Sequence, residues 1–176
     1  MLTFGAEGIY LRALEPEDLL FLDQIENDED LWHLSTTLAP FSKSILKKYI
    51  ANAHRTIYDT EQLRLVICCR ETDDQMGFID IFEFSAKHRR AGLGIVLQQK
   101  YRGKGYACQA IKAVLNYGFK HLDLHQFYAY VEIDNKKSLK LFETCNFIKT
   151  GERRDWNFHH NQFHTEALFQ IFNNVY

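Results

Sequence analysis

The stretch that most constrains the fold is an apolar run that leads through a short glycine-bearing loop into an amphipathic helix. The apolar run covers residues 91–97, and the loop, KYRGKG, covers residues 100–105. From residue 107 to residue 119, apolar side chains recur at helical spacing, with polar side chains on the opposite side. The sequence therefore predicts a strand, a loop and a helix in succession, with free backbone N–H groups where the helix begins.

This loop is suited to bind a phosphate or pyrophosphate group. The free N–H groups and the positive end of the helix dipole both attract an anion. Gly103 and Gly105 let the backbone approach closely because they carry no Cβ atom, and Arg102 and Lys104 add positive charge. The alternative is a plain turn whose glycines serve geometry only, and the two basic residues favour the anion site.

Two common phosphate-binding motifs do not fit the loop. A nucleoside-triphosphate loop requires G-x-x-x-x-G-K-[S/T], whereas Tyr106 follows Gly105 here. A dinucleotide fingerprint requires a third glycine, and Cys108 occupies its place. Neither a nucleoside-triphosphate site nor a dinucleotide site is therefore expected.

The composition favours one globular domain. A chain of 176 residues with 46% hydrophobic residues is suited to a single domain, 1–176, with a full core. The formal net charge of −2 argues against a general affinity for nucleic acid. Cys68, Cys69, Cys108 and Cys145 form no C-x-x-C pair, so we expect buried free thiols of a reducing compartment.

The hydropathy pattern favours a cytoplasmic location. Residues 1–14 lack a basic segment followed by a long apolar run, so a signal peptide is not expected. No stretch of about 18 apolar residues occurs, so no membrane span is expected either.

Further elements are expected on both sides of the central unit. Strands are predicted at residues 9–14, 63–69, 76–84, 126–133, 147–150 and 165–172. Helices are predicted after residues 15–18, after a cap at Ser42 or Ser44, and after a cap at Asp134 or Asn135. Their buried faces are expected to include Leu19, Leu20, Leu22 and Ile25 in the first helix, and Ile45, Leu46, Tyr49, Ile50 and Ala53 in the second. The short joint before residue 91 predicts antiparallel neighbours there.

The loop and its surroundings resemble the GNAT N-acetyltransferase superfamily. In that family a Gln/Arg-x-x-Gly-x-Gly/Ala segment binds the pyrophosphate of acetyl-coenzyme A (acetyl-CoA), and this chain has Lys100-x-x-Gly103-x-Gly105, with lysine in the first position. Residues 131–147 resemble the next family segment. Residues 10–19, 76–80 and 88–91 resemble the branch that acetylates ribosomal-protein N-termini and polyamines, the spermidine acetyltransferases especially. The resemblance extends from about Tyr10 to Phe172.

The resemblance implies an α/β (α+β) fold with a mixed, mostly antiparallel sheet of about six to seven strands. The central pair of strands is splayed, and helices cover both faces. The implied activity is transfer of an acetyl group from acetyl-CoA to a primary amine by direct attack in a ternary complex. The amine belongs to a polyamine such as spermidine or to a protein N-terminus. A homo-oligomer is left open. The alternatives are a non-catalytic or weakly catalytic acetyl-CoA sensor and, with less support, an RNA- or ribosome-associated factor.

The resemblance also assigns the cofactor-binding residues. The pantetheine arm and the oxyanion would meet backbone N–H groups of Gly94, Ile95, Val96 and Leu97. The pyrophosphate would meet Arg102, Gly103, Lys104, Gly105 and Ala107. Asn135 is the matched position that contacts the cofactor in relatives, and helix capping is an equally good account of it. Phe142 stands at the cofactor-facing position where relatives place a tyrosine.

The general base has two candidates. A free amine has a pKa near that of lysine, about 10.4, so a proton must leave before attack at neutral pH. Glu83 and Asp80 lie on the strand expected beside the 91–97 strand, and strand alternation places them on opposite faces. Some polyamine-acetylating relatives carry a glutamate where this chain has Gly92, so that residue is not available here.

The general acid of relatives is missing. Their tyrosine is the acid assigned to the departing thiolate, and Phe142 cannot donate a proton. A thiol still leaves fairly well as its anion because its pKa is about 8.5. We therefore expect a slower enzyme, or one that uses water or a nearby hydroxyl such as Tyr130.

Two charged segments allow more than one interpretation. Between Arg12 and Lys43 the chain has acidic residues and no Lys or Arg, which fits a solvated acidic face or an attractor for a cationic acceptor. His159, His160, His164 and Glu166 lack the helical H-E-x-x-H spacing, so a polar hairpin is expected there. No metal cofactor is expected.

Overall fold

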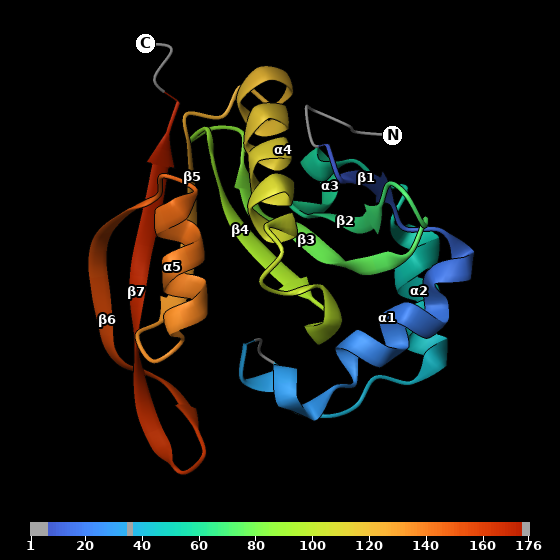
Figure 1. Ribbon diagram of the computed structural model, residues 1–176, viewed down its shortest axis with the longest axis horizontal. Coiled ribbons are helices and arrows are strands. Elements are labelled where there is room, and N and C mark those ends of the chain that lie inside the picture. Colours follow the sequence, from blue (N-terminus) through green and yellow to red (C-terminus); the bar gives the residue numbers. More distant parts are fainter. Residues whose placement is uncertain (1–6, 35–36, 174–176) are drawn as a thin grey trace.

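The computed structural model describes residues 7–34 and 37–173, and one mixed sheet organises them (Figure 1). Within these residues, seven strands follow the order β1-β2-β3-β4-β5-β7-β6. They are β1 (Ile9–Ala13), β2 (Leu63–Cys69), β3 (Gln75–Ser85), β4 (Arg90–Leu97), β5 (Gln126–Glu132), β6 (Ile148–His159) and β7 (Gln162–Phe172). Neighbours pair antiparallel except β4 and β5, which pair parallel. The expected mixed, mostly antiparallel sheet is confirmed.

Helices cover both faces of the sheet. They are α1 (Leu19–Glu26), α2 (Lys43–Asn52), α3 (Ile57–Thr60), α4 (Tyr106–His121) and α5 (Lys136–Thr144), with 3₁₀ turns η1 (Pro16–Asp18), η2 (Glu29–Leu34) and η3 (Gln99–Tyr101). The larger core cluster joins α4 and α5 to one face through residues such as Ile111, Phe127 and Phe169. A smaller cluster joins α1 and α2 to the other face. None of the helices among the described residues is long and apolar enough to span a bilayer.

Local sequence signals set the helix starts. Ser42 caps α2, because its side chain accepts a hydrogen bond from the N–H of Ile45 at 3.3 Å. Pro16 lies in the turn before α1, where its missing N–H leaves no donor unpaired. Two apolar residues expected to be buried are exposed instead: Leu20 is 63% exposed and Ile45 is 53% exposed. Each lies one step, about 100°, from the buried stripe of its helix.

The four cysteines are free thiols, as expected, but they differ in burial. Cys68 and Cys145 are buried, whereas Cys69 and Cys108 are half-buried. The sulfur atoms of Cys145 and Cys108 lie 2.8 Å apart, which brings the end of α5 against the first turn of α4. Burial and this contact raise the pKa of the Cys145 thiol.

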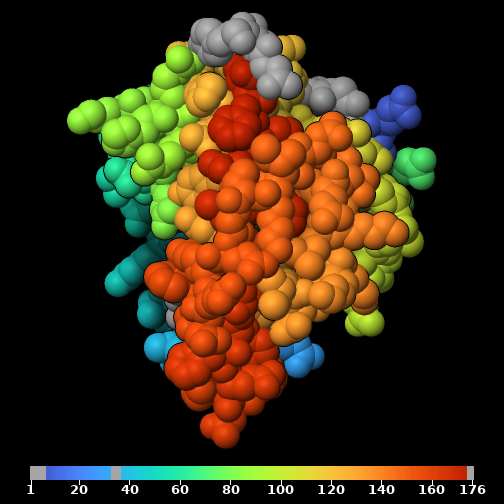
Figure 2. All heavy atoms as spheres, turned by 90° about the vertical axis from the view of Figure 1, so that its left-hand side faces the viewer, coloured from blue at the N-terminus to red at the C-terminus, as the bar shows by residue number. Residues whose placement is uncertain are grey.

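The C-terminal strands are longer than the sequence predicted. Residues 151–164, expected as a polar segment, continue β6 and β7 into a hairpin whose turn places His160 and Asn161 at φ 48° and 60°. Positive φ at both turn residues is typical of a two-residue hairpin turn. Trp156, Phe158 and Phe163 lie on one face of this extension and are exposed, so no buried apolar face marks it. Figure 2 shows the hairpin tip as a narrow projection at the lower end of the molecule.

The parallel central pair is splayed, as expected. β4 and β5 pair only at Arg90 with Gln126, at Ala91 with Phe127 and at Gly92 with Tyr128. Beyond Gly92 the rest of β4 keeps its pairing with β3, and its other edge meets no strand among the described residues. The two strands diverge toward their carboxyl ends, below the start of α4 in Figure 1.

Candidate active site

The glycine loop adopts a conformation that glycine favours. Gly103 has φ +76° and Gly105 has φ +82°, both in the left-handed region. An added Cβ atom at either position would meet nothing within 4 Å. These glycines therefore allow the loop backbone to take this conformation, and the space beside them is open.

The start of α4 has no side-chain cap. Gly105 occupies the N-cap position, and the first helical hydrogen bond runs from the N–H of Gln109 to its carbonyl oxygen at 3.2 Å. By contrast, side-chain oxygens cap both α2 and α5. The first N–H groups of α4 therefore point toward the open space beside the loop, where an anion would satisfy them.

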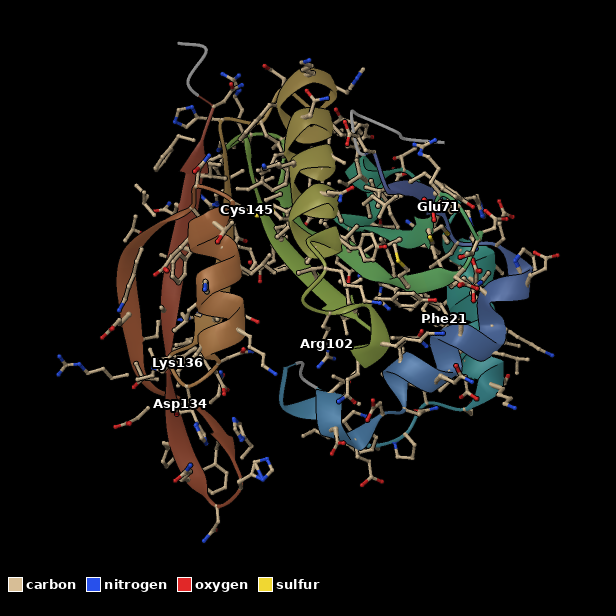
Figure 3. All side chains as sticks on the ribbon, in the orientation of Figure 1. Phe21, Glu71, Arg102, Asp134, Lys136 and Cys145 are labelled. Atoms are coloured by element: carbon tan, nitrogen blue, oxygen red, sulfur yellow. The ribbon has the colours of Figure 1, made fainter. Side chains whose placement is uncertain are left out.

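Basic side chains surround the loop. The Arg102 Nε donates a hydrogen bond to the carbonyl oxygen of Leu97 at 2.8 Å, which ties the loop to the end of β4. Figure 3 shows Arg102 below the start of α4. Lys100 and Lys104 hold their ammonium groups 4.8 and 6.0 Å from the ring centre of Tyr101. The loop is therefore positively charged on the side of the helix start.

The strand β4 presents the predicted pantetheine-binding residues at the split. Gly94, Ile95 and Val96 are half-buried and Leu97 is buried. All four pair with β3 on one side, from Gly94 with Asp80 to Leu97 with Gly77. Every second N–H group of a strand points to its other edge, and here that edge faces the split.

The two predicted residues of α5 have local structural roles. The Asn135 side chain accepts a hydrogen bond from the N–H of Ser138 at 3.1 Å and so caps α5. Phe142 is only 4% exposed, and its ring packs against Phe147 and Phe169 at centroid distances of 5.1 and 6.3 Å. This position is therefore apolar and has no proton to donate.

Glu83 lies where a β-bulge reverses the expected direction of its side chain. The pairing of β3 with β4 shifts between Phe82 and Ser85, and Glu83 has φ +48°. Its carboxylate accepts a hydrogen bond from the hydroxyl of Tyr128 at 2.5 Å, on the face that also carries Asp80. The expectation that Glu83 and Asp80 lie on opposite faces is wrong, because the bulge breaks strand alternation.

The Tyr128 hydroxyl keeps its proton and donates it in the hydrogen bond to Glu83. Burial and the bond to the carboxylate both raise the pKa of Tyr128. Tyr128 therefore stays protonated at neutral pH. Glu83 itself is exposed, so one carboxylate oxygen is fixed by the hydroxyl while the group still faces the open surface.

Asp80 is held in an ion pair. Arg64 contacts its two oxygens through Nε at 2.7 Å and Nη2 at 3.0 Å, and the Nη1 of Arg64 also pairs with Glu26. Burial would lower the pKa of Arg64, but Asp80 raises it, so the guanidinium keeps its charge. Both Asp80 oxygens are therefore occupied, which suits a structural role.

The ring of Phe82 fills the space beside Gly92. A Cβ atom on Gly92 would lie 2.3 Å from one ring atom of Phe82 and 2.5 Å from another. Tyr130 lies farther along the same face, 37% exposed, with the Arg153 guanidinium 3.8 Å from its ring centre. The face therefore carries Glu83, Tyr128 and Tyr130 beside a strand position that tolerates no side chain.

The acidic stretch between Arg12 and Lys43 divides into two groups. Asp18, Asp23 and Glu26 pair with Arg12, Lys43 and Arg64, respectively. Glu15, Glu17, Asp28, Glu29 and Asp30 are exposed. Three of these acids lie at residues 28–30, where η2 begins at the end of the molecule that holds the split (Figure 1).

The chain matches a known family over most of its length. The model of the acetyltransferase (GNAT) domain matches residues 9–148. The spermidine N(1)-acetyltransferase of Escherichia coli K12 is 28% identical over 172 residues, which cover 98% of this chain and 90% of the relative. The same enzyme of Vibrio cholerae is 30% identical over 144 residues, which cover 80% of this chain and 79% of the relative.

A solved structure agrees with this match. The spermidine N-acetyltransferase of Vibrio cholerae, crystallised in complex with CoA and spermine, has a TM-score of 0.83 and 26% sequence identity. The alignment covers 94% of this chain and 95% of that one. The split sheet, the uncapped helix behind a glycine loop and these matches agree, and the chain therefore belongs to the GNAT family of acetyl-CoA-dependent N-acetyltransferases.

Proposed function

We propose that this chain acetylates a primary amine of a polyamine such as spermidine, by direct attack of the amine on acetyl-CoA in a ternary complex. The observation that carries the proposal is the split between β4 and β5 beside an uncapped, basic helix start. Relatives named as spermidine acetyltransferases, aligned over nearly the whole chain, support the polyamine. The chain acts as a single domain, 1–176, in the cytoplasm.

The cofactor lies along the split and the loop. The pyrophosphate sits at the start of α4, where Arg102, Gly103, Lys104, Gly105 and Ala107 supply N–H groups and charge. The pantetheine arm lies beside the free edge of β4 like a short additional strand and forms hydrogen bonds with the backbone of residues 94–97. Asn135 holds α5 in place beside it through the cap, and the Phe142 ring gives the thioester end an apolar wall.

Glu83 is the general base. Its carboxylate is exposed and fixed by one hydrogen bond, so the second oxygen is available to take a proton from the amine, directly or through one water. Asp80 does not take this role, because Arg64 holds both of its oxygens. Gly92 carries no side chain, so the Phe82 ring lies over β4 and Tyr128 reaches across the same strand to Glu83.

The departing thiolate has no tyrosine at position 142. The thiolate leaves as the anion, whose conjugate acid has a pKa of about 8.5, and takes its proton from water or from the Tyr130 hydroxyl. Tyr130 is 37% exposed on the same face as Glu83. Turnover without a dedicated acid is slower, because such an acid typically contributes about 10²–10⁴-fold.

The exposed acids favour a polycation as acceptor. Asp28, Glu29 and Asp30 are exposed, and no Lys or Arg lies between Arg12 and Lys43. Their field raises the local concentration of a multiply charged amine. Salt therefore raises the KM for a polyamine more than the KM for a singly charged amine.

The chain also forms a homo-oligomer under this proposal. A dodecameric structure of the Vibrio cholerae spermidine N-acetyltransferase matches this chain with a TM-score of 0.78 and 28% identity over 94% of the chain. Large apolar side chains on the β6–β7 hairpin are exposed in the single chain, Trp156, Phe158 and Phe163. Light scattering of the purified protein measures the number of chains directly.

The experiment that tests the function is an acceptor screen by thiol release. Acetyl-CoA is mixed with enzyme and spermidine, with enzyme and an alanyl or seryl peptide, and with enzyme alone. Release with spermidine is expected. Release with the peptide only would replace the polyamine by a protein N-terminus, and CoA binding without release in any mixture would contradict acetyl transfer. Gly105→Glu, which places a carboxylate at the pyrophosphate position, is the control that must abolish release.

A further inference from the structure

Three neighbouring strands bring two imidazoles and a carboxylate together near the turn of the β6–β7 hairpin. They are Glu132 at the end of β5, His159 at the end of β6 and His164 near the start of β7. One ligand atom from each lies within 4.8 Å of the others. We infer that this cluster binds one divalent transition-metal ion, with Zn²⁺ the best match.

The first pair of ligands is already close to the spacing that zinc requires. The His159 Nε2 lies 3.0 and 2.9 Å from the two carboxylate oxygens of Glu132. A tetrahedral zinc ion 2.0–2.1 Å from each ligand sets its ligand atoms roughly 3.3 Å apart. The ion would take the place of the proton that these two groups share, with a movement of a few tenths of an ångström.

The third ligand has a buried nitrogen with nothing to bind. The His164 side chain is only 8% exposed, and its Nε2 has no hydrogen-bond partner among the described residues. A buried polar atom without a partner is costly, and an ion would remove that cost. The His164 ring stacks on the His159 ring with centroids 3.8 Å apart, and one His164 nitrogen lies within 4.8 Å of the ligand atoms of His159 and Glu132, so zinc binding requires the His164 ring to turn out of this stack.

The surroundings match those of metal-binding histidines. The other nitrogen of His164, Nδ1, lies 3.4 Å from the Asp134 carboxylate, and metal-binding histidines commonly have such a carboxylate partner on their second nitrogen. Asn157 donates hydrogen bonds from Nδ2 to Glu132 at 2.9 Å and to Glu166 at 3.3 Å. Glu166 in turn pairs with Arg153. Three carboxylates against one guanidinium leave a negative charge at the site, which favours a cation.

The ligand chemistry selects the kind of metal. Two imidazoles and one carboxylate suit Zn²⁺ and neighbouring ions, whereas Mg²⁺ and Ca²⁺ prefer oxygen ligands alone. The side chains of Glu132 and His159 are 10% and 18% exposed, so the ion would be largely shielded, with room for a water as fourth ligand. Such an ion would connect β5, β6 and β7 and stabilise the hairpin without taking part in acetyl transfer. Figure 3 shows the neighbouring Asp134 where the hairpin begins.

Calorimetry and thermal unfolding test the site on the full, tag-free chain after treatment with a chelator. Zinc chloride is expected to bind once per chain and, at a hundredfold excess over Kd, to raise the Tm by about 5–10 °C. Magnesium chloride is expected to change neither. His164→Gln and Glu132→Gln are expected to weaken zinc binding at least tenfold, and His88→Gln, on the exposed turn between β3 and β4, is the matched control that keeps it.

Spectroscopy keeps the test valid if a variant fails to fold. Co²⁺ added to the unmodified chain is expected to give the strong visible absorption of a tetrahedral site, and one equivalent of Zn²⁺ is expected to remove it. A weak, octahedral-type spectrum overturns the proposal. So does equal zinc binding by the three variants, since it would place the ion on adventitious surface histidines.

Discussion

A β-bulge decides on which face of the sheet the Glu83 side chain lies, and therefore which role Glu83 can take. The bulge at Phe82 turns the carboxylate toward Tyr128, beside a strand position without a side chain. If Glu83 takes the proton from the amine, Glu83→Gln lowers kcat by about 10²–10⁴-fold, because glutamine accepts no proton. The KM for acetyl-CoA is expected to stay the same. Steady-state kinetics with spermidine measures both constants.

Asp80→Asn is the matched comparison, three residues away on the same strand. It weakens the ion pair that holds the charge of Arg64, so the free energy of unfolding is expected to fall while kcat in the folded protein changes little. The opposite pattern, a large loss of kcat for Asp80→Asn and a small one for Glu83→Gln, would exchange the two roles.

Phe142 offers a second residue-scale prediction. Its ring is packed against Phe147 and Phe169, so Phe142→Tyr adds one hydroxyl at the edge of an apolar cluster. If the missing acid limits thiolate departure, kcat at saturating substrates is expected to rise, and the Tm is expected to fall slightly because the hydroxyl loses water. An unchanged kcat would mean that proton donation to the thiolate does not limit this enzyme.

Asp18 gives a prediction that depends on pH. Burial alone would raise the pKa of Asp18, but hydrogen bonds from Arg12, the N–H of Glu15 and Gln75 outweigh burial and lower it. A lowered pKa in the folded state stabilises the protein above the unfolded value of about 3.9, and this stability is lost as the pH falls through the folded pKa. Asp18→Asn is therefore expected to cost about 3 kcal/mol at pH 7 and progressively less as the pH falls through the lowered pKa of Asp18. Urea unfolding at several pH values measures the difference, and an equal cost at every pH would contradict the assignment.

The loop between β4 and α4 carries the prediction at the scale of elements. Gly105 has φ +82°, and a residue with a Cβ atom pays roughly 1–2 kcal/mol to adopt that conformation. Gly105→Ala is therefore expected to raise the KM for acetyl-CoA about tenfold, because each 1.4 kcal/mol is a factor of ten. Gly151→Ala is the control, since its added Cβ also meets open space but its φ is ordinary. Equal KM values for the two variants would show that the loop conformation does not matter for binding.

Elements with a clear hydrophobic period or a local capping residue were predictable from the sequence. Features that depend on pairing with strands far away in the chain were not. The strand at residues 63–69 and the cap at Asn135 match the prediction because apolar runs and capping residues are local signals. A polar hairpin was expected around His159, but the extension of β6 and β7 through residues 151–164 was not, because its aromatic side chains are exposed and mark no buried face. In the candidate site, the loop and the split were predicted from the motif. By contrast, the Glu83 bulge, the Phe82 ring over Gly92 and the meeting of Glu132 with His164 depend on strand pairing that no local pattern records.

At the scale of the whole molecule, the β6–β7 hairpin is a part of the surface that exposes a cluster of large aromatic side chains. Trp156, Phe158 and Phe163 are 57%, 60% and 62% exposed, and the last two rings pack together with centroids 4.9 Å apart. The hairpin that carries them projects from the rest of the fold (Figure 2). Clustered exposed aromatics on a projecting element are typical of an interface between chains.

If copies of this chain associate through the hairpin, Phe158→Ser combined with Phe163→Ser removes apolar area from the interface and leaves the core unchanged. The mass measured by light scattering is then expected to fall to a smaller assembly, while the Tm measured at low protein concentration stays close to that of the unmodified chain. Tyr58→Ser, at a side chain that is 61% exposed on α3 far from the hairpin, is expected to leave the mass unchanged. A mass that falls for Tyr58→Ser and not for the hairpin variant would place the interface on the opposite end of the molecule, because each substitution removes an aromatic side chain of comparable exposure.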